Sequence, residues 1–212
     1  MRNVLLYITG ALILISTWLC TTAAAVAPPD RNIVYVHVPA AISSLVCFAA
    51  VFVCSIQYLR TERRLWDFTA AASAEVGLVF ATVFNITGMI FAHAQWGTWW
   101  TFTPRLVSSA ALWFLYAAYC LLRTALAERY YMRRLSAVFG IIAFTDVPLV
   151  VISARFIRDI HRPGVTFETA LQTSAFILAI TAALLLAAVL VLMRIDILQA
   201  KAKLETKTEP DS

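Results

Sequence analysis

Charged residues are scarce in this sequence, and it has no long polar stretch that could fold as a soluble domain. Of its 212 residues, 14% are charged and 61% are hydrophobic, and the mean hydropathy is +0.80. A soluble domain has about 25% charged residues and about half apolar residues. The chain also lacks a GxxxxGK[ST] motif, which excludes a phosphate-binding loop of that type. We therefore expect a protein of the lipid bilayer, and any ATPase that works with it would be another subunit.

Cysteine is also rare, and its spacing excludes three kinds of site. The four cysteines stand alone within apolar stretches, and no CxxC or CxxCH motif occurs. This pattern excludes a disulfide framework, a zinc site and a covalently attached c-type haem. We expect all four to behave as small buried apolar residues. They are Cys20, Cys47, Cys54 and Cys120.

Long apolar stretches, by contrast, make up most of the chain. A transmembrane helix needs about 20 mostly apolar residues, and six stretches reach that length. The predicted fold class is therefore all-α, a polytopic membrane protein with six transmembrane helices. The helices are predicted at residues 4–26, 38–59, 68–92, 106–126, 135–153 and 169–193.

The predicted organisation is one membrane domain followed by a short tail. The six-helix domain covers residues 1–198 and carries an outer Trp-rich loop at 93–105. Residues 199–212 alternate in charge sign and are predicted as a cytoplasmic tail, either a solvated helix end or a disordered segment. The first apolar stretch ends like a signal peptide, but it is longer than the roughly 7–15 residues of a signal peptide core. Its length favours a retained helix.

Lysine and arginine are distributed unevenly between the two sides of the predicted bundle. Twelve of them fall on the side that carries both termini, and five fall on the other side. The positive-inside rule therefore predicts cytoplasmic termini and a multi-pass protein of the cell membrane, inner or plasma. The net charge of +5 follows from this bias and gives no reason to expect nucleic acid as a partner. The five outer residues are Arg31, Arg105, Arg155, Arg158 and Arg162.

Three of the six tryptophans lie within five residues, from Trp96 to Trp100. They fall on the outer side, between the third and fourth predicted helices. Indoles gathered next to a glycine suit a flat, mostly apolar ligand. Tryptophan is also enriched at membrane–water interfaces, so an aromatic belt explains the same segment. The composition of the segment leaves the ligand platform and the belt as equal alternatives.

All three histidines map to the same outer side. They are His37 at the start of the second predicted helix, His93 at the end of the third, and His161 before the sixth. Neutral imidazole is a common ligand of haem iron, and two histidines on separate loops could hold a planar macrocycle from opposite sides. Each histidine alone is more simply a helix-end residue that reaches water. Outer arginines such as Arg105 suit haem propionates, but anionic lipid headgroups or Asp159 explain them as well.

Two carboxylates, Glu75 and Asp146, fall within the third and fifth predicted helices. An ionisable group inside the membrane is costly and is a functional-site hypothesis by default. A proton relay needs a ladder of such groups, and two at different depths do not form one. We therefore expect both carboxylates to make hydrogen bonds between helices. Pro148 is expected to kink the fifth helix.

These segments together resemble a known family. The stretch WGTWWTFTPRL, from Trp96 to Leu106, is similar to the WWD-domain motif WGxWWxWDxRL of the haem-handling protein superfamily. The stretches YVHVPAA at 35–41 and IHRP at 160–163 resemble the two histidine segments of the same family. Over essentially its whole length, the chain resembles the C component of cytochrome c maturation, a CcmC-like haem-handling membrane protein.

The resemblance implies a site and a function. His37 and His161 would be the axial ligands of a haem b iron at the outer membrane surface. The other expected haem contacts are Trp96, Trp99, Trp100 and Arg105. The implied activity is delivery of haem to an extracytoplasmic, periplasmic haem chaperone, alongside an ABC transporter's ATP-binding subunit and second membrane subunit. Such transfer makes and breaks no bond within haem, so the chain is not expected to be an enzyme.

The chain departs from the family motif at two positions, where Phe102 and Thr103 replace Trp-Asp. Phenylalanine keeps an aromatic face but loses the indole N–H, and threonine loses the negative charge. Stacking is therefore expected to persist, whereas any contact of the carboxylate is lost. His93 has no counterpart in the motif, and we favour a helix-capping role over a spare iron ligand or a propionate partner.

Two other classes of function are alternatives. A haem lyase of the related family would usually be larger, and a b-type electron-transfer cytochrome would bury histidine pairs within its helices. Here the histidines lie only at predicted helix ends. A permease subunit of an ABC transporter would need polar residues along its path, and the predicted helices carry few. Haem binding and delivery is therefore the leading hypothesis.

Overall fold

The protein is a bundle of helices. The computed structural model describes residues 2–25, 32–125, 130–156 and 167–208, and no strand occurs within these ranges. The all-α class predicted from composition is therefore confirmed. The helices are α1 (Arg2–Ala25), α2 (Val34–Thr61), α3 (Arg64–Trp96), α4 (Pro104–Ala125), α5 (Tyr130–Ala143), α6 (Asp146–Phe156) and α7 (Ala170–Thr208).

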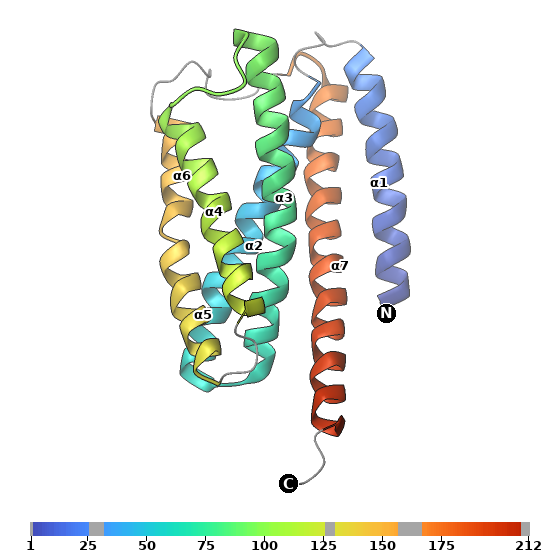
Figure 1. Ribbon diagram of the computed structural model, residues 1–212. Helices are drawn as coiled ribbons and strands as arrows, with labels where there is room; N and C mark the ends of the chain where they lie inside the picture. The colour runs from blue at the N-terminus through green and yellow to red at the C-terminus, as the bar shows by residue number, and fades with distance from the viewer. Residues whose placement is uncertain (1, 26–31, 126–129, 157–166, 209–212) are drawn as a thin grey trace.

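Six segments of the described chain are long and apolar enough to cross a membrane. Five of them are single helices. The remaining one, Tyr131–Ser153, is fifth along the chain and runs through α5 and α6 together. Helices α1, α3 and α6 end, and α2, α4 and α7 begin, at one end of the bundle (Figure 1). We call this end the Trp end, because it carries the segment Trp96–Trp100. Helix α1 begins near the opposite end of the bundle, and α7 ends there. This end carries Arg60, Arg63 and Arg64, and we call it the basic end.

The fifth predicted helix, 135–153, is confirmed as a membrane span but is divided into two helices. Helix α5 ends at Ala143, a turn follows, and α6 begins at Asp146. Pro148 lies in the first turn of α6, where its missing N–H removes no helical hydrogen bond. A carboxylate at the first position, such as that of Asp146, also suits the positive end of the helix dipole. The irregularity expected at the proline is therefore a two-residue turn just before it.

Three further helices extend beyond their predicted bounds, among them α3, which runs from Arg64 to Trp96 rather than over 68–92. Helix α2 begins at Val34 rather than at residue 38, which places His37 in its first turn and Pro39 inside the helix. Helix α7 continues to Thr208 rather than ending at residue 193, so the first part of the predicted tail is helical. The first and fourth predicted helices agree with α1 and α4 to within two residues.

The core of the bundle lies around α2 and α3, which pack against each other along their length. The buried face of α3 consists largely of small residues, among them Ala74 and Gly77. A Cβ atom at Gly77 would lie 2.7 Å from Cε1 of Phe48, so the two helices approach closely only because this position is glycine. Phe48 in turn stacks on Tyr116 of α4, with ring centroids 3.6 Å apart. Small residues at such contacts are usual for helices packed in membranes.

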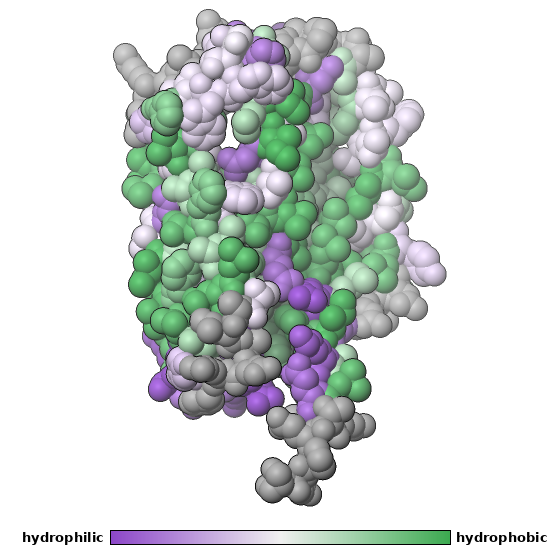
Figure 2. All heavy atoms as spheres, viewed as in Figure 1, coloured by the Kyte–Doolittle hydropathy of each residue, from purple (hydrophilic) through white to green (hydrophobic). Residues whose placement is uncertain are grey.

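The side of the bundle is largely apolar, as a lipid-facing surface should be. Figure 2 shows hydrophobic side chains over the middle of the visible face and hydrophilic ones gathered toward its lower end, the basic end. Helix α1 packs mainly against α7, at the edge of the bundle (Figure 1). Its Trp18 is 65% exposed. Lipid chains are apolar and would cover this surface, so it needs no protein partner.

Candidate functional site

The tryptophan segment begins within α3 and continues into the loop that follows. Helix α3 extends to Trp96, so the loop comprises residues 97–103 and is shorter than the predicted 93–105. Gly97 ends the helix, because its φ of 70° is left-handed and its N–H donates to the carbonyl of His93 at 2.9 Å. Glycine is favoured at this position because it has no Cβ. Gly97 therefore separates Trp96, which belongs to the helix, from Trp99 and Trp100, which belong to the loop.

The imidazole of His93 stacks on the indole of Trp99. Their ring centroids are 4.1 Å apart and their planes differ by 9°. Both side chains are exposed, Trp99 to 52%. The capping contact of His93 uses only its backbone carbonyl, which any residue could supply. The capping role predicted for this histidine is therefore wrong for its side chain, which supports Trp99 instead.

The other two tryptophans make edge-on aromatic contacts. Trp96 meets Phe91 with ring centroids 5.6 Å apart, and Trp100 meets Phe102 at 6.4 Å. The hydroxyl of Thr98 donates to the carbonyl of Trp100 at 2.9 Å, which ties the loop to itself. Phe102 is 89% exposed, more than any other large hydrophobic side chain in the described chain. The loop is thus held by local contacts and presents aromatic surface outward.

His37 projects from the first turn of α2 onto α3. Its Nδ1 lies 3.0 Å from the hydroxyl oxygen of Thr87, and its ring meets Phe84 edge-on at 6.1 Å. A Cβ atom at Gly88 would lie 3.1 Å from Cε1 of the imidazole, so this glycine leaves room for the ring. The side chain is half-buried. The packing of α2 on α3 therefore holds the imidazole against three residues of the neighbouring helix.

The contact with Thr87 bears on which nitrogen of His37 carries the proton. A threonine hydroxyl has one hydrogen, and the hydroxyl of Thr87 lies within hydrogen-bond distance of two carbonyls of its own helix, those of Val83 at 2.7 Å and Phe84 at 3.1 Å. This geometry favours the hydroxyl as the acceptor for His37, which corresponds to the tautomer with the proton on Nδ1. This is the tautomer that binds a metal ion through Nε2, and an outer hydrogen bond from Nδ1 is usual for such ligands.

The predicted site residues that the structure describes lie at the Trp end, at different depths. Thr87, the partner of His37, precedes Trp96 by nine residues of α3, a rise of roughly 14 Å at about 1.5 Å per residue. His37 therefore lies deeper in the bundle than the tryptophan loop. Arg105 lies in the first turn of α4, directly after the loop, and is half-buried.

His161, the second predicted ligand, lies outside the described residues, as do Arg158 and Arg162. Arg155 belongs to α6, but its side chain is also outside the described part. The pairing of His37 with His161 on one haem therefore stays a prediction.

The two carboxylates predicted within the membrane behave differently. Glu75 of α3 accepts two hydrogen bonds from Arg194 of α7, from Nε at 2.6 Å and from Nη2 at 3.0 Å. The interhelical link predicted for this residue is confirmed. The Oδ2 atom of Asp146 is buried and has no hydrogen-bond partner among the described residues. Its carboxylate begins α6, as described above, rather than forming the predicted link.

A buried ion pair at the basic end was missed from the sequence. Arg123 of α4 donates to both carboxylate oxygens of Asp67 in α3, at 2.7 and 2.9 Å. Asp67 is 4% exposed, and Arg133 of α5 lies 3.9 Å from its Oδ2. The group joins three helices. The only signal in the sequence was an aspartate next to the start of the third predicted helix, and its partner appears only once the helices pack.

Known proteins resemble this chain over most of its length. The profile of the family described as Heme exporter protein C matches residues 1–209. Heme exporter protein C of Escherichia coli K12 is 30% identical over 166 residues, which cover 77% of this chain and 68% of the relative. A putative cytochrome c biosynthesis ccmC-like mitochondrial protein of Arabidopsis thaliana is 29% identical over 182 residues, covering 79% of this chain and 68% of the relative. Heme exporter protein C of Rhodobacter capsulatus is 34% identical over 95 residues, which cover 45% of this chain and 39% of the relative.

Proposed function

The chain belongs to the Heme exporter protein C family, and from that premise we propose that it binds haem at the Trp end and delivers it to an extracytoplasmic haem chaperone. It is a multi-pass membrane protein of cytochrome c biogenesis. Haem is the cargo in this proposal, held by coordination and stacking and then released. Release of this kind breaks no bond within haem, so the proposed role is that of a carrier and not of an enzyme.

The orientation of His37 carries the proposal. Its Nδ1 lies 3.0 Å from the hydroxyl of Thr87, an arrangement that suits iron binding through the other nitrogen, Nε2. Phe84 and Gly88 hold the ring in that orientation. A histidine that only reached water from a helix end would need no such support. Second contacts of this kind are typical of metal-binding imidazoles.

The tryptophan loop would supply the apolar surface against which a porphyrin lies. Trp99 is about half-exposed although one of its contacts is the ring of His93. An indole in an interfacial belt also faces the headgroup region, but it needs no fixed orientation there. The stacked pair of His93 and Trp99 presents an aromatic plane of defined direction, which favours the platform over the belt.

The remaining contacts of the proposed site follow from the family resemblance and from position. We assign His161 as the second axial ligand of haem b, which together with His37 would give iron two imidazole ligands. Arg105 follows the loop directly, and a guanidinium is a planar partner for a haem propionate. The charge bias of the sequence supports an orientation with the Trp end on the outer side of the cell membrane and the basic end in the cytoplasm. The proposed partners are two subunits of an ABC transporter, an ATP-binding subunit on the cytoplasmic side and a second membrane subunit.

Absorption spectra of the purified protein test the haem site. The wild type, purified from cells that make haem, is expected to show a Soret band. The double variant His37→Ala, His161→Ala is expected to lose it, because both iron ligands are removed. His93→Phe is the matched control, since it removes the third histidine of the same side but keeps an aromatic ring against Trp99, and it should retain the band. A haem-free wild type would overturn the proposal, and loss of the band in the control alone would mean that the ligand is His93.

Delivery is tested separately from binding. Haem-loaded protein in detergent is mixed with an apo haem chaperone from the same organism, and the two are then separated. The chaperone fraction is expected to gain the haem spectrum as the membrane protein loses it. A protein that binds haem through His37 yet transfers none to the chaperone would contradict the delivery step while leaving the binding site intact.

A further inference from the structure

A pocket at the basic end takes no part in the haem site proposed above. It lies between the start of α3 and the last turns of α7, and its volume is about 290 Å³. The pocket brings together residues more than 130 positions apart in the sequence, so only the packing of α3 against α7 creates it. Its lining residues are Arg64, Leu65, Phe68, Gln199, Ala202 and Lys203.

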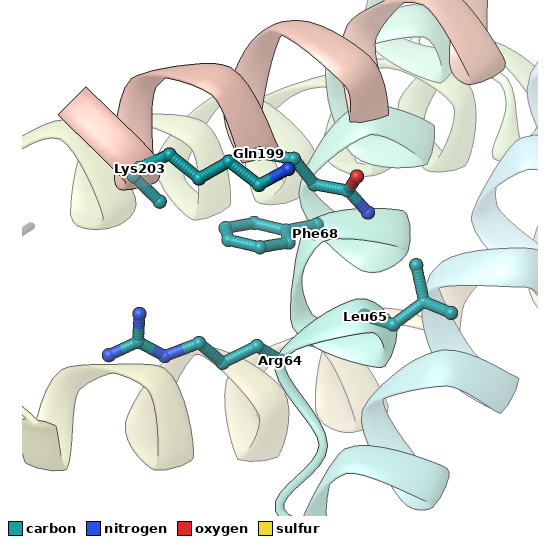
Figure 3. Close-up of a pocket in the computed structure, with 6 residues that line it drawn as sticks. Arg64, Leu65, Phe68, Gln199 and Lys203 are labelled. Atoms are coloured by element: carbon teal, nitrogen blue, oxygen red, sulfur yellow. The ribbon is translucent and has the colours of Figure 1, made fainter.

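The lining combines positive charge with an apolar floor. In Figure 3 the ring of Phe68 lies between Arg64 on one side and Lys203 on the other. Leu65 and Ala202 extend the apolar surface, and Gln199 adds a side-chain amide. A ligand that matches this lining must carry a negative charge next to apolar groups. A small inorganic anion would leave the floor uncovered.

The pocket lies where both helices leave the membrane. Arg64 precedes Trp96 by 32 residues of α3, a rise of about 48 Å, which is close to the roughly 40–45 Å thickness of a bilayer with its headgroups. With the Trp end at one membrane surface, Arg64 would lie among the headgroups of the other, and Phe68 would lie about one turn further in. Arginine and lysine at helix ends commonly lay their stems along apolar surface while the charge reaches the interface.

The surroundings favour an anion further. The N-cap of α3, Arg63, makes no side-chain capping hydrogen bond within the described chain, so the positive end of this helix dipole faces the pocket without a capping side chain. Two neighbouring carboxylates pair with cations outside the lining, Glu62 with Arg134 at 3.2 Å and Glu205 with Lys201 at 3.8 Å. The charged residues of the lining itself, Arg64 and Lys203, are both cations.

We propose that this pocket binds the headgroup of an anionic phospholipid. Arg64 and Lys203 would contact the phosphate, and the acyl chains would lie along the apolar surface between α3 and α7. Basic pockets between transmembrane helices on the cytoplasmic side are typical sites for such headgroups. The lipid would join α3 to α7 near their ends, as the pair of Glu75 and Arg194 joins them further into the bundle.

Native mass spectrometry of the full chain in detergent tests the site, with phosphatidylglycerol as the anionic probe and phosphatidylcholine as the neutral one. The wild type is expected to bind phosphatidylglycerol preferentially. The double variant Arg64→Gln, Lys203→Gln should lose about tenfold or more in that affinity, since each basic residue near an anionic surface contributes about fivefold. The control Arg60→Gln, Arg63→Gln removes the same charge at the same end without altering the lining, and it should stay within about twofold of the wild type.

Three outcomes would overturn the proposal. Equal losses in the pocket variant and the control would mean a general charge effect. Displacement of phosphatidylglycerol by inorganic phosphate at comparable concentration would mean a free-anion site. Loss of haem from the pocket variant with unchanged lipid binding would mean a second haem contact. If the double variant does not fold, the single variant Arg64→Gln gives the same comparison with an expected loss of about fivefold.

Discussion

The two ends of the bundle use polar side chains in different ways. At the basic end, carboxylates and arginines form closed pairs, as Asp67 does with Arg123 through two hydrogen bonds. At the Trp end, the described rings support one another and still present surface outward, as His93 and Trp99 do. His37 shows the same arrangement, because its Nδ1 lies against the hydroxyl of Thr87 while the residue is only half-buried. Charge at one end joins helices to one another, and aromatic surface at the other stays partly exposed, as the proposed haem site requires.

This difference follows from the cost of burying each kind of group. A charged side chain in the bundle interior must have a partner, because an isolated ion there is expensive. Asp67 meets this requirement within the protein. An indole or a neutral imidazole carries no such penalty, so it can remain incompletely covered until a ligand arrives. Polar residues that are fully paired are therefore poor candidates for the site, and partly exposed rings in fixed orientations are good ones.

The largest effect is expected from breaking the buried pair at the basic end. Asp67→Asn leaves Arg123 buried without a counter-charge and should lower the free energy of unfolding by about 3–5 kcal/mol. Unfolding in detergent by heat or denaturant measures the loss. Glu62→Gln is the control, because its pair with Arg134 is exposed and should contribute no more than about 1 kcal/mol. The haem spectrum of the folded Asp67→Asn protein should be unchanged, and a shifted Soret band would show that the two ends are coupled.

The next effect is expected from removing the hydroxyl that orients His37. Thr87→Val keeps the shape of the side chain but leaves Nδ1 without its acceptor. Haem affinity should fall by about 10- to 100-fold, as is usual when an outer partner of a metal-binding histidine is lost. Haem titration followed by absorption measures this, and Thr87→Ser, which keeps the hydroxyl, should bind within about threefold of the wild type. Equal affinities for the valine variant and the wild type would show that the hydroxyl does not set the tautomer.

The smallest effect is expected from the platform itself. Trp99→Ala removes one stacking surface and should weaken haem binding by about 2- to 12-fold, the equivalent of about 0.5–1.5 kcal/mol for an aromatic contact. Trp18→Ala is the matched control, because Trp18 is an exposed tryptophan of α1 outside the loop. The same titration compares them. If both variants lost affinity equally, the loop tryptophans would be interfacial anchors and the contrast between the two ends would fail.

Helix lengths show how far hydropathy alone could predict the fold. The six membrane crossings were predicted correctly, because crossing a bilayer requires a number of apolar residues that can be counted along the chain. Individual ends were predicted less well. The apolar pattern of α3 stops before its polar last turn at His93 and Gln95, yet the helix continues until Gly97 can adopt a left-handed conformation. Helix ends follow capping geometry as well as hydropathy.

The break before α6 shows a different limit. Pro148 correctly indicated an irregularity, but a proline marks either a kink or a helix start, and the sequence pattern is the same for both. Likewise, the sequence led to the same prediction for Glu75 and Asp146, a hydrogen bond between helices. Only Glu75 meets an arginine, because α7 passes beside it.

The sequence by itself determined the class of the protein, the number of its membrane crossings and its family, since these depend on composition, on apolar length and on short motifs such as Trp96–Trp100. Only the tertiary structure decided which residues act together. His37 meets Thr87 across 50 positions, and Asp67 meets Arg123 across 56. A helical repeat specifies which residues share a face but not which faces meet. The partners that orient an imidazole, neutralise a carboxylate or form a pocket with two cations are therefore set by helix packing.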